Sequence, residues 1–231
     1  MNNPDKPVGK VSVKIIIRTI LFLALIIAVI FISAGRLDYW QGWAYVGLSI
    51  LFLILSYLLL SSELIHERLK PENGVKNWNK IFQKVSVPIF IAILVISSLD
   101  GARFNWYPQV PFYVIIIGIL GFITGQIIFL RAKQVNRYFS SVVHIQTDRG
   151  QTVCKDGPYR RVRHPGYLGS LIYSVATPLI LGSFWGLIPV MISLALLIIR
   201  TQMEDKTLQN ELEGYTEYTR EVKYKILPGI W

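Results

Sequence analysis

Six long apolar blocks constrain what this chain of 231 residues can fold into, because only Arg18 brings a charge into any of them. A helix needs about 20 apolar residues to cross a bilayer, with a range of roughly 17–25. Only 16% of the residues are charged, against roughly a quarter in soluble domains. The blocks are Ile15–Ala34, Trp43–Ser61, Val85–Leu99, Phe112–Leu130, Tyr167–Leu181 and Phe184–Ile199. The sequence therefore predicts an all-α integral membrane protein with about six transmembrane helices.

The blocks differ in length, and the differences carry structural expectations. The last two are short and meet at Gly182-Ser183, which predicts a tilted helical hairpin. The third is also short and contains Pro88. The first exceeds the 7–15 apolar residues that are typical of a cleaved signal peptide, so we expect Ile15–Ala34 to be a retained span.

The basic residues predict the orientation of the chain. If six spans alternate, 22 of the 24 Lys and Arg residues fall on one side, and only Arg36 and Arg103 on the other. Because basic loops stay in the cytoplasm, both termini are expected there, in the inner membrane of a prokaryote. The net charge of +10 is then explained by topology and by anionic lipid headgroups, so nucleic acid is not an expected partner.

The stretch from Arg131 to Tyr167 is long for a loop and has apolar residues throughout, so we expect it to be folded and functional. It ends in the sequence GPYRRVRHPGYLG, residues 157–169. Pro165 suits the first turn of a helix, where its missing N–H costs nothing. The next three backbone N–H groups, from Gly166 to Leu168, would then form a site for a carboxylate or phosphate.

Arg200 and Glu204 follow where the hairpin returns to the cytoplasmic surface. Residues four apart share one face of a helix, so the two side chains are neighbours. They are either a simple salt bridge at a helix end or part of a site with the loop. Likewise, Arg160, Arg161 and Arg163 either anchor the loop to headgroups or belong to that site.

Several other patterns favour ordinary structural roles. Gly121 and Gly125 form a G-x-x-x-G pair, which in an apolar helix indicates close helix packing. The three histidines lack the spacing of metal ligands, so no metal is expected. The single cysteine, Cys154, lies on the cytoplasmic side and is expected to be a small packing residue.

In combination, these motifs resemble the isoprenylcysteine carboxyl methyltransferase family and its bacterial, phospholipid methyltransferase-like relatives. The resemblance rests on Gly157-x-Tyr159, Arg163-His164-Pro165-x-Tyr167-x-Gly169, Arg200-x-x-x-Glu204, Tyr215-x-x-Tyr218 and the terminal Leu227-Pro228-Gly229-Ile230-Trp231, with Gln146 and Arg149-Gly150 upstream. It covers residues 131–231, whereas residues 1–130 match only as four generic membrane spans. The chain is therefore expected to divide into an N-terminal four-span part, 1–130, and a methyltransferase core, 131–231.

The resemblance implies a membrane-embedded methyltransferase that uses S-adenosylmethionine, held in a cytoplasmic pocket between the loop and the C-terminal segment. Its methyl acceptor would be lipidic or apolar, either the carboxylate of a prenylated cysteine-like molecule or a lipid amine. Carried over by position, Arg200 and Glu204 would be catalytic. Those that would bind the cofactor are Gln146, Gly157, Tyr159, Arg163, His164, Pro165, Tyr167 and Glu204.

The chain departs from the family pattern at positions that concern the acceptor more than the cofactor. Asp205 stands where many relatives have a second Glu, and Gln151 where His is common. Lys155 replaces the usual Thr or Ser, and Glu221 replaces an Arg.

Two other functional classes are compatible with a small polytopic protein. Sterol reductases resemble this family in their C-terminal helices but use NADPH, and they typically have Asn before the Tyr where this chain has Pro165-Gly166. A transporter or assembly factor would usually show ionisable residues inside its spans or paired broken helices. The apolar blocks here show neither beyond Pro88 and the hairpin.

Overall fold

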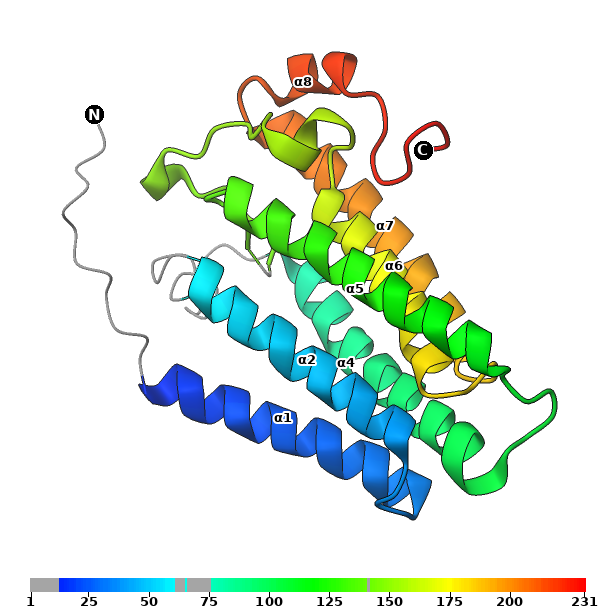
Figure 1. The fold of residues 1–231 in the computed structure, drawn as a ribbon. Coiled ribbons are helices and arrows are strands. Elements are labelled where there is room, and N and C mark those ends of the chain that lie inside the picture. The colour runs from blue at the N-terminus through cyan, green and yellow to red at the C-terminus, as the bar shows by residue number, and fades with distance from the viewer. Residues whose placement is uncertain (1–12, 61–64, 66–75, 141) are drawn as a thin grey trace.

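The computed structural model describes residues 13–60, 65, 76–140 and 142–231 of the chain. Its α-helices are α1 (Val13–Ala34), α2 (Trp40–Leu59), α4 (Asn77–Ser98), α5 (Phe112–Val135), α6 (Pro165–Ile180), α7 (Leu187–Glu211) and α8 (Tyr215–Glu221) (Figure 1). Short helical pieces are the π-helix η1 (Leu99–Phe104), η2 (Thr147–Arg149) and η3 (Gly157–Arg160). Within the described ranges there is no strand, so the prediction of an all-α protein is confirmed.

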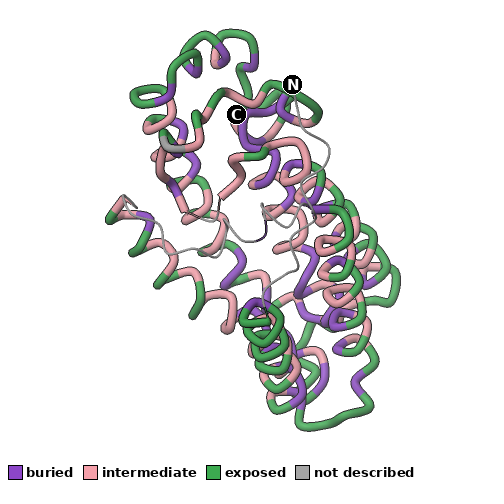
Figure 2. The backbone as a smooth tube through the Cα atoms, turned by 90° about the vertical axis from the view of Figure 1, so that its left-hand side faces the viewer, coloured by how far each residue is buried: buried purple, intermediate pink, exposed green. Residues whose placement is uncertain are grey.

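Five of these helices are long and apolar enough to cross a bilayer: α1, α2, α4 with η1, α5 and α7. The fifth predicted span corresponds to α6, which has 16 residues and forms the expected hairpin with α7. The tip of this hairpin contains Gly182 and Ser183. Many large apolar residues on the long helices are exposed, such as Leu21, Leu51 and Ile117. Figure 2 shows exposed stretches, in green, along the helices. Apolar helix surfaces of this kind are suited to lipid, and the chain is an integral, multi-pass membrane protein.

Two predicted boundaries were wrong, and both helices are longer than the apolar blocks. The loop expected as far as Lys84 ends earlier, since α4 begins at Asn77 and includes Pro88. The last segment was expected to end at Ile199, but α7 continues to Glu211. The polar residues after Ile199 include good helix formers and neither Gly nor Pro, so nothing stops the helix before Gly214. Arg200 and Glu204 therefore lie inside a helix and not at its end.

Some sequence expectations concern parts of the chain outside the described residues. These are the N-terminus, which is predicted to be cytoplasmic, and His66, one of the three histidines that lack the spacing of metal ligands.

Glycines allow α5 and α6 to pack backbone against backbone. A Cβ atom at Gly125 would lie 2.7 Å from the carbonyl oxygen of Gly169, and one at Gly169 would lie 2.6 Å from the carbonyl oxygen of Gly125. Gly118 is similarly tight against the backbone N of Ile180. The close packing predicted from the G-x-x-x-G pair is thus confirmed. It fixes the N-terminus of α6 beside the C-terminal end of α5, where the polar loop begins.

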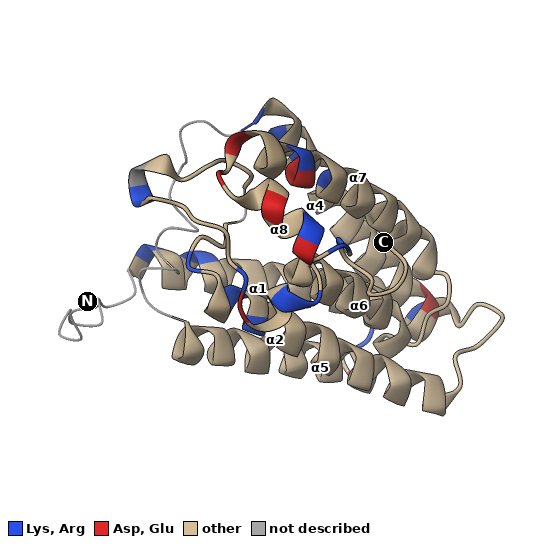
Figure 3. Cartoon of the chain, turned by 90° about the horizontal axis from the view of Figure 1, so that it is seen from above, with Lys and Arg blue, Asp and Glu red and all other residues tan. Residues whose placement is uncertain are grey.

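The loop between α5 and α6, the polar end of α7, α8 and the C-terminal segment gather at one end of the helices (Figure 1). Charged side chains are concentrated there, whereas α5 shows almost none along its apolar length (Figure 3). The C-terminal segment is attached by its backbone: the N–H groups of Arg163 and His164 donate to the carbonyls of Tyr224 and Lys225, at 2.9 and 2.8 Å.

The 22-to-2 division of basic residues predicts how the protein is oriented. We expect single cysteines at Gln109 and Asp156, both exposed positions, to be labelled from opposite sides when Cys154 is replaced by Ala. Asp156 should react only with reagent on the cytoplasmic side, since it belongs to the basic loop. Labelling of intact spheroplasts and inverted vesicles measures this. Reaction of position 109 from the cytoplasmic side would contradict the six-span topology.

Candidate active site

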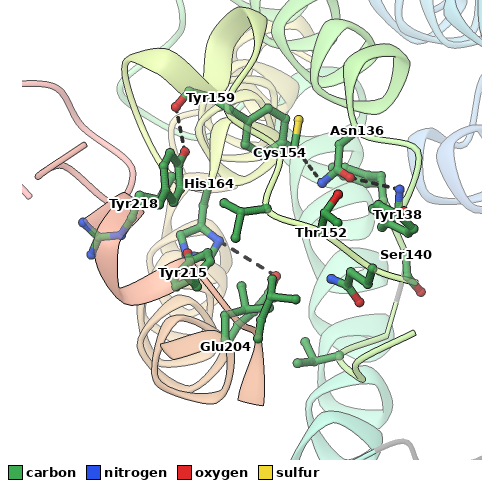
Figure 4. A pocket seen from close by; sticks show the side chains of 18 of the residues that line it. Asn136, Tyr138, Ser140, Thr152, Cys154, Tyr159, His164, Glu204, Tyr215 and Tyr218 are labelled. Atoms are coloured by element: carbon green, nitrogen blue, oxygen red, sulfur yellow. Dashed lines mark hydrogen bonds and ion pairs between the residues drawn. The ribbon is translucent and has the colours of Figure 1, made fainter. Parts of the chain in front are cut away.

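A pocket lies where the loop between α5 and α6 meets the polar end of α7 and α8 (Figure 4). Tyr159, His164, Glu204, Tyr215 and Tyr218 stand on one side of it, and Asn136, Tyr138, Ser140 and Thr152 on the other (Figure 4). The rest of the lining is Phe139, Val142, Val143, His144, Gln151, Val153, Cys154, Arg163, Gly166, Tyr167, Leu208 and Leu212. The pocket is thus built from the loop, the hairpin and the C-terminal part of the chain.

The structure brings together five of the residues predicted to bind a cofactor, namely Tyr159, Arg163, His164, Tyr167 and Glu204. The other predicted residues, Gln146, Gly157, Pro165 and Arg200, are close in the chain but are not part of the lining.

Two of those residues shape the loop. The side chain of Gln146 is buried, donates to the carbonyl of Tyr138 at 2.9 Å and accepts from Arg149 at 2.6 Å, so it holds the loop together. Gly157 has a φ of +55°, which favours glycine, and a Cβ there would come within 3.0 Å of Val135.

An ion pair at the base of the pocket joins the end of the loop before α6 to α7. The guanidinium of Arg163 binds the carboxylate of Asp205 with both Nε and Nη2, at 2.8 and 2.9 Å. Its Nη1 donates to the carbonyls of Val222 and Lys223. Both charged side chains are nearly inaccessible, at 6% and 2% exposed. A bidentate pair whose guanidinium also donates to two carbonyls is a strong geometry for a buried charge.

Asp205 also organises the aromatic side of the pocket. It accepts from Tyr215 at 3.0 Å and from Gln209 at 2.9 Å, and Nε2 of His164 lies 3.2 Å from its Oδ1. Burial raises the pKa of the Tyr215 hydroxyl, and the neighbouring Asp205 carboxylate adds to this shift, so the hydroxyl remains a donor. Burial likewise raises the pKa of the Tyr159 hydroxyl, which accepts from Asn136 at 3.2 Å.

Tyr167 connects the two residues predicted to be catalytic. Its hydroxyl donates to the Glu204 carboxylate, and its ring centre lies 5.5 Å from the Arg200 guanidinium carbon. On its other side the ring of His164 is stacked nearly parallel, at 5.6 Å and 9°. Nδ1 of His164 lies 3.8 Å from Glu204, so His164 stands between the Glu204 and Asp205 carboxylates.

Arg200 lies toward the membrane and contacts α4. Its guanidinium carbon is 4.6 Å from the ring centre of Phe82, so the cation lies between the rings of Phe82 and Tyr167. Arg200 is one helical turn farther into the apolar part of α7 than Glu204. A single helix therefore carries a cation on the membrane side and a carboxylate on the pocket side.

The expectation of an anion site at the start of α6 was largely wrong. Pro165 does occupy the first turn, as predicted. However, the N–H groups of Tyr167 and Leu168 both donate to the carbonyl of His164, at 3.0 and 3.2 Å. Gly166 is buried, and a Cβ there would meet the ring of Phe139 at 2.7 Å.

The chemistry of the lining suits a bulky, positively charged ligand with polar groups. Tyrosine faces attract cations, and the Glu204 carboxylate adds a negative charge. The opposite wall offers neutral hydrogen-bonding groups from Asn136, Ser140 and Thr152. Burial raises the pKa of the Cys154 thiol, which disfavours a thiolate nucleophile in this wall.

Sequence reasoning missed several residues of this site. Asp205 was noted only as a departure from a family pattern, and Asn136 and Tyr138 were not singled out. No sequence signal marked the burial of Asp205, because it belongs to the polar stretch 200–211 of α7, where a carboxylate ordinarily faces water. No local pattern marks Asn136 or Tyr138, which join the site only through the fold of the loop.

Comparison with known proteins supports the sequence resemblance. Residues 114–210 match the model of the isoprenylcysteine carboxyl methyltransferase (ICMT) family. This segment includes α5, the loop, the hairpin and the three residues Arg200, Glu204 and Asp205. A search among curated proteins found no match to the chain. Residues 114–210 of this membrane protein are therefore similar to the ICMT family, whose enzymes are S-adenosylmethionine-dependent methyltransferases.

Proposed function

We propose that this protein transfers a methyl group from S-adenosylmethionine to the carboxylate of a lipidic, prenylcysteine-like acceptor at the cytoplasmic face of the membrane. The observation that carries the proposal is the placement of Arg200 and Glu204 on one helix, with Tyr167 between them. The first side chain faces the apolar part of the bundle, and the second faces the polar pocket. A donor in the pocket and a lipid in the membrane would meet at Tyr167.

The pocket fits the cofactor. When bound, S-adenosylmethionine supplies a methyl group on a positively charged sulfur, which an acceptor oxygen displaces in line. Tyr159 and Tyr215 line the pocket with aromatic rings that can attract that charge. Glu204 and His164 would hold the amino acid end, and Asn136 and Thr152 on the opposite wall would hold the polar groups of the nucleoside.

The polar contacts of Glu204 favour a carboxylate acceptor over an amine. A carboxylate is already deprotonated and needs only a cation to orient it, which Arg200 provides. An amine would have to lose a proton, and Glu204 is the nearest candidate base. That carboxylate already accepts from Tyr167 and faces His164, so it is engaged in holding the pocket.

In this proposal the two parts of the chain have different roles. Residues 131–231 supply the cofactor pocket, and the four spans within residues 1–130 supply the membrane frame. The division is not complete, because Phe82 of α4 contacts Arg200.

Ligand-dependent thermal stabilisation of the purified protein tests the cofactor. A ligand that binds only the folded state stabilises it by about 2.7 kcal/mol at 100 times its Kd. We expect S-adenosylhomocysteine to raise the melting temperature and NADPH to leave it unchanged. Stabilisation by NADPH alone would favour a reductase, and stabilisation by neither would favour a non-enzymatic role. Methyl transfer to a prenylcysteine analogue, but not to a lipid amine, tests the acceptor.

Substitutions of the side chains in the pocket should change cofactor affinity without unfolding the protein. We expect His164→Ala and Tyr159→Phe to differ in their affinity for S-adenosylmethionine. His164→Ala removes a ring from the pocket and should weaken binding about tenfold or more, because a buried partner of Glu204 is lost. The second removes only a hydroxyl that contacts Asn136 and should change affinity little. Isothermal titration calorimetry measures both. Wild-type affinity in His164→Ala would show that the pocket is not the cofactor site.

A further inference from the structure

Residues 226–231, which we call the C-terminal loop, lie outside the pocket and have no role in the site described so far. Four backbone hydrogen bonds of 3.0 or 3.1 Å join the two ends of this loop. Gly229 makes its turn with a φ of +82°, which favours glycine. Ile226 at its start is buried, whereas Ile230 is 79% exposed. The loop therefore has a fixed shape that presents a large apolar side chain outward.

Two contacts of Lys225 place the C-terminal loop along α7. The Nζ of Lys225 donates to the side chain of Gln202 and lies 4.8 Å from the ring centre of Trp231. Gln202 is three residues, or about 4.5 Å, beyond Ile199, where the apolar part of α7 ends. In Figure 1 the C-terminal segment accordingly runs from α8 back along α7. The headgroup layer on each side of a bilayer is about 5–8 Å deep, so the loop lies at the level of the headgroups.

The face of α7 beside the loop continues into lipid. Gln202 shares this face with Ile198, four residues before it, and with Lys206, four residues after it. Ile199, three residues before Gln202, lies on the same face. Ile198 and Ile199 are 48% and 54% exposed, as is usual for residues that lipid covers. The C-terminal loop therefore adjoins the surface of α7 that the bilayer covers.

The side chains around the loop have the chemistry of an interface with an anionic bilayer. Residues 222–231 include Lys223 and Lys225 and contain no acidic residue. Lys206 and Lys223 are exposed. Tryptophan is enriched where membrane meets water, and lysine side chains there keep their charge among the headgroups. A leaflet with apolar chains below and negative groups above complements this arrangement.

We propose that the C-terminal loop is an interfacial anchor, in which Ile230 and Trp231 insert at the boundary between headgroups and acyl chains of the cytoplasmic leaflet. The neighbouring lysines bind its anionic headgroups. Residues 222–225, directly before the loop, form a strap whose four carbonyls accept hydrogen bonds from Arg163 and His164. The bilayer thus holds this strap against the loop before α6. The effect on the cofactor rests on the proposed function, whereas the contact with lipid does not.

The depth of residue 230 in the bilayer tests the anchor. In the Cys154→Ala background, Ile230→Cys, Ile199→Cys and Glu217→Cys are each labelled with bimane. The nanodiscs contain phosphatidylethanolamine, phosphatidylglycerol and a lipid with a nitroxide either near the headgroup or near the end of the acyl chain. The label at 230 should be quenched most by the shallow nitroxide. The lipid-facing position 199 should also be quenched, and position 217, exposed on α8, should be quenched by neither.

Two outcomes of this measurement would overturn the anchor. Quenching at position 230 as weak as at position 217 would show that the C-terminal loop faces water. Stronger quenching at position 230 by the deep nitroxide than by the shallow one would place the loop in the acyl core instead of the interface. Because position 217 carries the same label, an affinity of bimane itself for lipid would appear there as well.

Ile230→Asp and its matched control Ile230→Leu test whether the anchor holds the strap. The carboxylate should be expelled from the leaflet, and apparent affinity falls with the fraction of molecules in the binding-competent state. We expect the Kd for S-adenosylhomocysteine in the same nanodiscs to rise about two- to tenfold in Ile230→Asp, as for a strap seated in half to a tenth of the molecules. Ile230→Leu should bind as the wild type does.

The two experiments distinguish the ways in which the inference can fail. Wild-type affinity in Ile230→Asp would show that the bilayer does not hold the strap. Equal losses of affinity in Ile230→Asp and Ile230→Leu would point to the shape of the side chain, and would overturn the role of the leaflet. A wild type that binds no S-adenosylhomocysteine would remove the proposed function, while the depth measurement would still decide whether the loop is an anchor.

Discussion

Replacing Arg200 with alanine should lower kcat/KM for the lipidic acceptor by about 100- to 1,000-fold while S-adenosylhomocysteine affinity stays close to that of the wild type. Loss of one preorganised group that orients a reacting oxygen typically has an effect of this size. The side chain lies toward the apolar part of the bundle, between the rings of Phe82 and Tyr167, and not in the lining of the pocket. Initial-rate kinetics and calorimetry on the same preparation measure the two quantities.

Glu204→Ala should have the opposite pattern of effects on acceptor kinetics and cofactor affinity. Its carboxylate lines the pocket and accepts from Tyr167, so this variant should lose cofactor affinity first. Arg200→Lys serves as a control, because it keeps the charge but loses the planar guanidinium that binds a carboxylate with two hydrogen bonds.

The structural alternative, a helix salt bridge, makes a contrary prediction. An exposed pair at this spacing contributes only about 0.3–0.5 kcal/mol. The charge-reversed variant, Arg200→Glu with Glu204→Arg, would preserve such a pair and exchange the two roles. Recovery of activity in that variant would mean that the pair is structural and that the site assignment is wrong.

Replacing Asp205 with alanine should lower the free energy of unfolding by about 3–5 kcal/mol, the usual cost of removing one partner from a buried ion pair. Arg163 would keep its contacts with two carbonyls but lose its counter-charge in a place that is 6% exposed. His164 and Tyr215 would each lose a polar partner. The loop before α6 should lose its attachment to α7 at this point, and cofactor affinity should fall with stability.

A matched control exists on the same helix. Glu211 pairs with Lys76 at 2.7 Å, but both side chains are more than a third exposed. Glu211→Ala should therefore change stability by less than about 1 kcal/mol. Thermal unfolding in a single detergent compares the two variants. Equal effects would show that the Arg163–Asp205 pair adds nothing beyond an ordinary surface pair.

Much of the fold could be predicted from the sequence because the transfer of long apolar segments into lipid dominates how a membrane chain is arranged. The blocks located the spans, and Gly182-Ser183 located the hairpin tip. Helix ends could not be predicted in the same way, because polarity does not end a helix. Residues 200–211 are polar but have good helix propensity, so α7 extends beyond the apolar block.

The site was predictable only where residues are close in the chain or belong to a family motif. Tyr159, His164 and Tyr167 lie within nine residues of each other, and all three line the pocket. Arg163 also lines it, but the partner that engages its guanidinium, Asp205, is 42 residues away.

The uninterrupted course of α7 limits how this enzyme could acquire a new substrate. Arg200 and Glu204 are separated by four residues of one rigid helix, an axial offset of about 6 Å. Inserting or deleting a residue between them would rotate one relative to the other by about 100° and take it out of the site. The helix therefore fixes the axial offset between the acceptor and the cofactor that these two residues are proposed to hold. A change of acceptor specificity has to come from side chains on neighbouring helices, of which α4 is the nearest to Arg200 with a described contact.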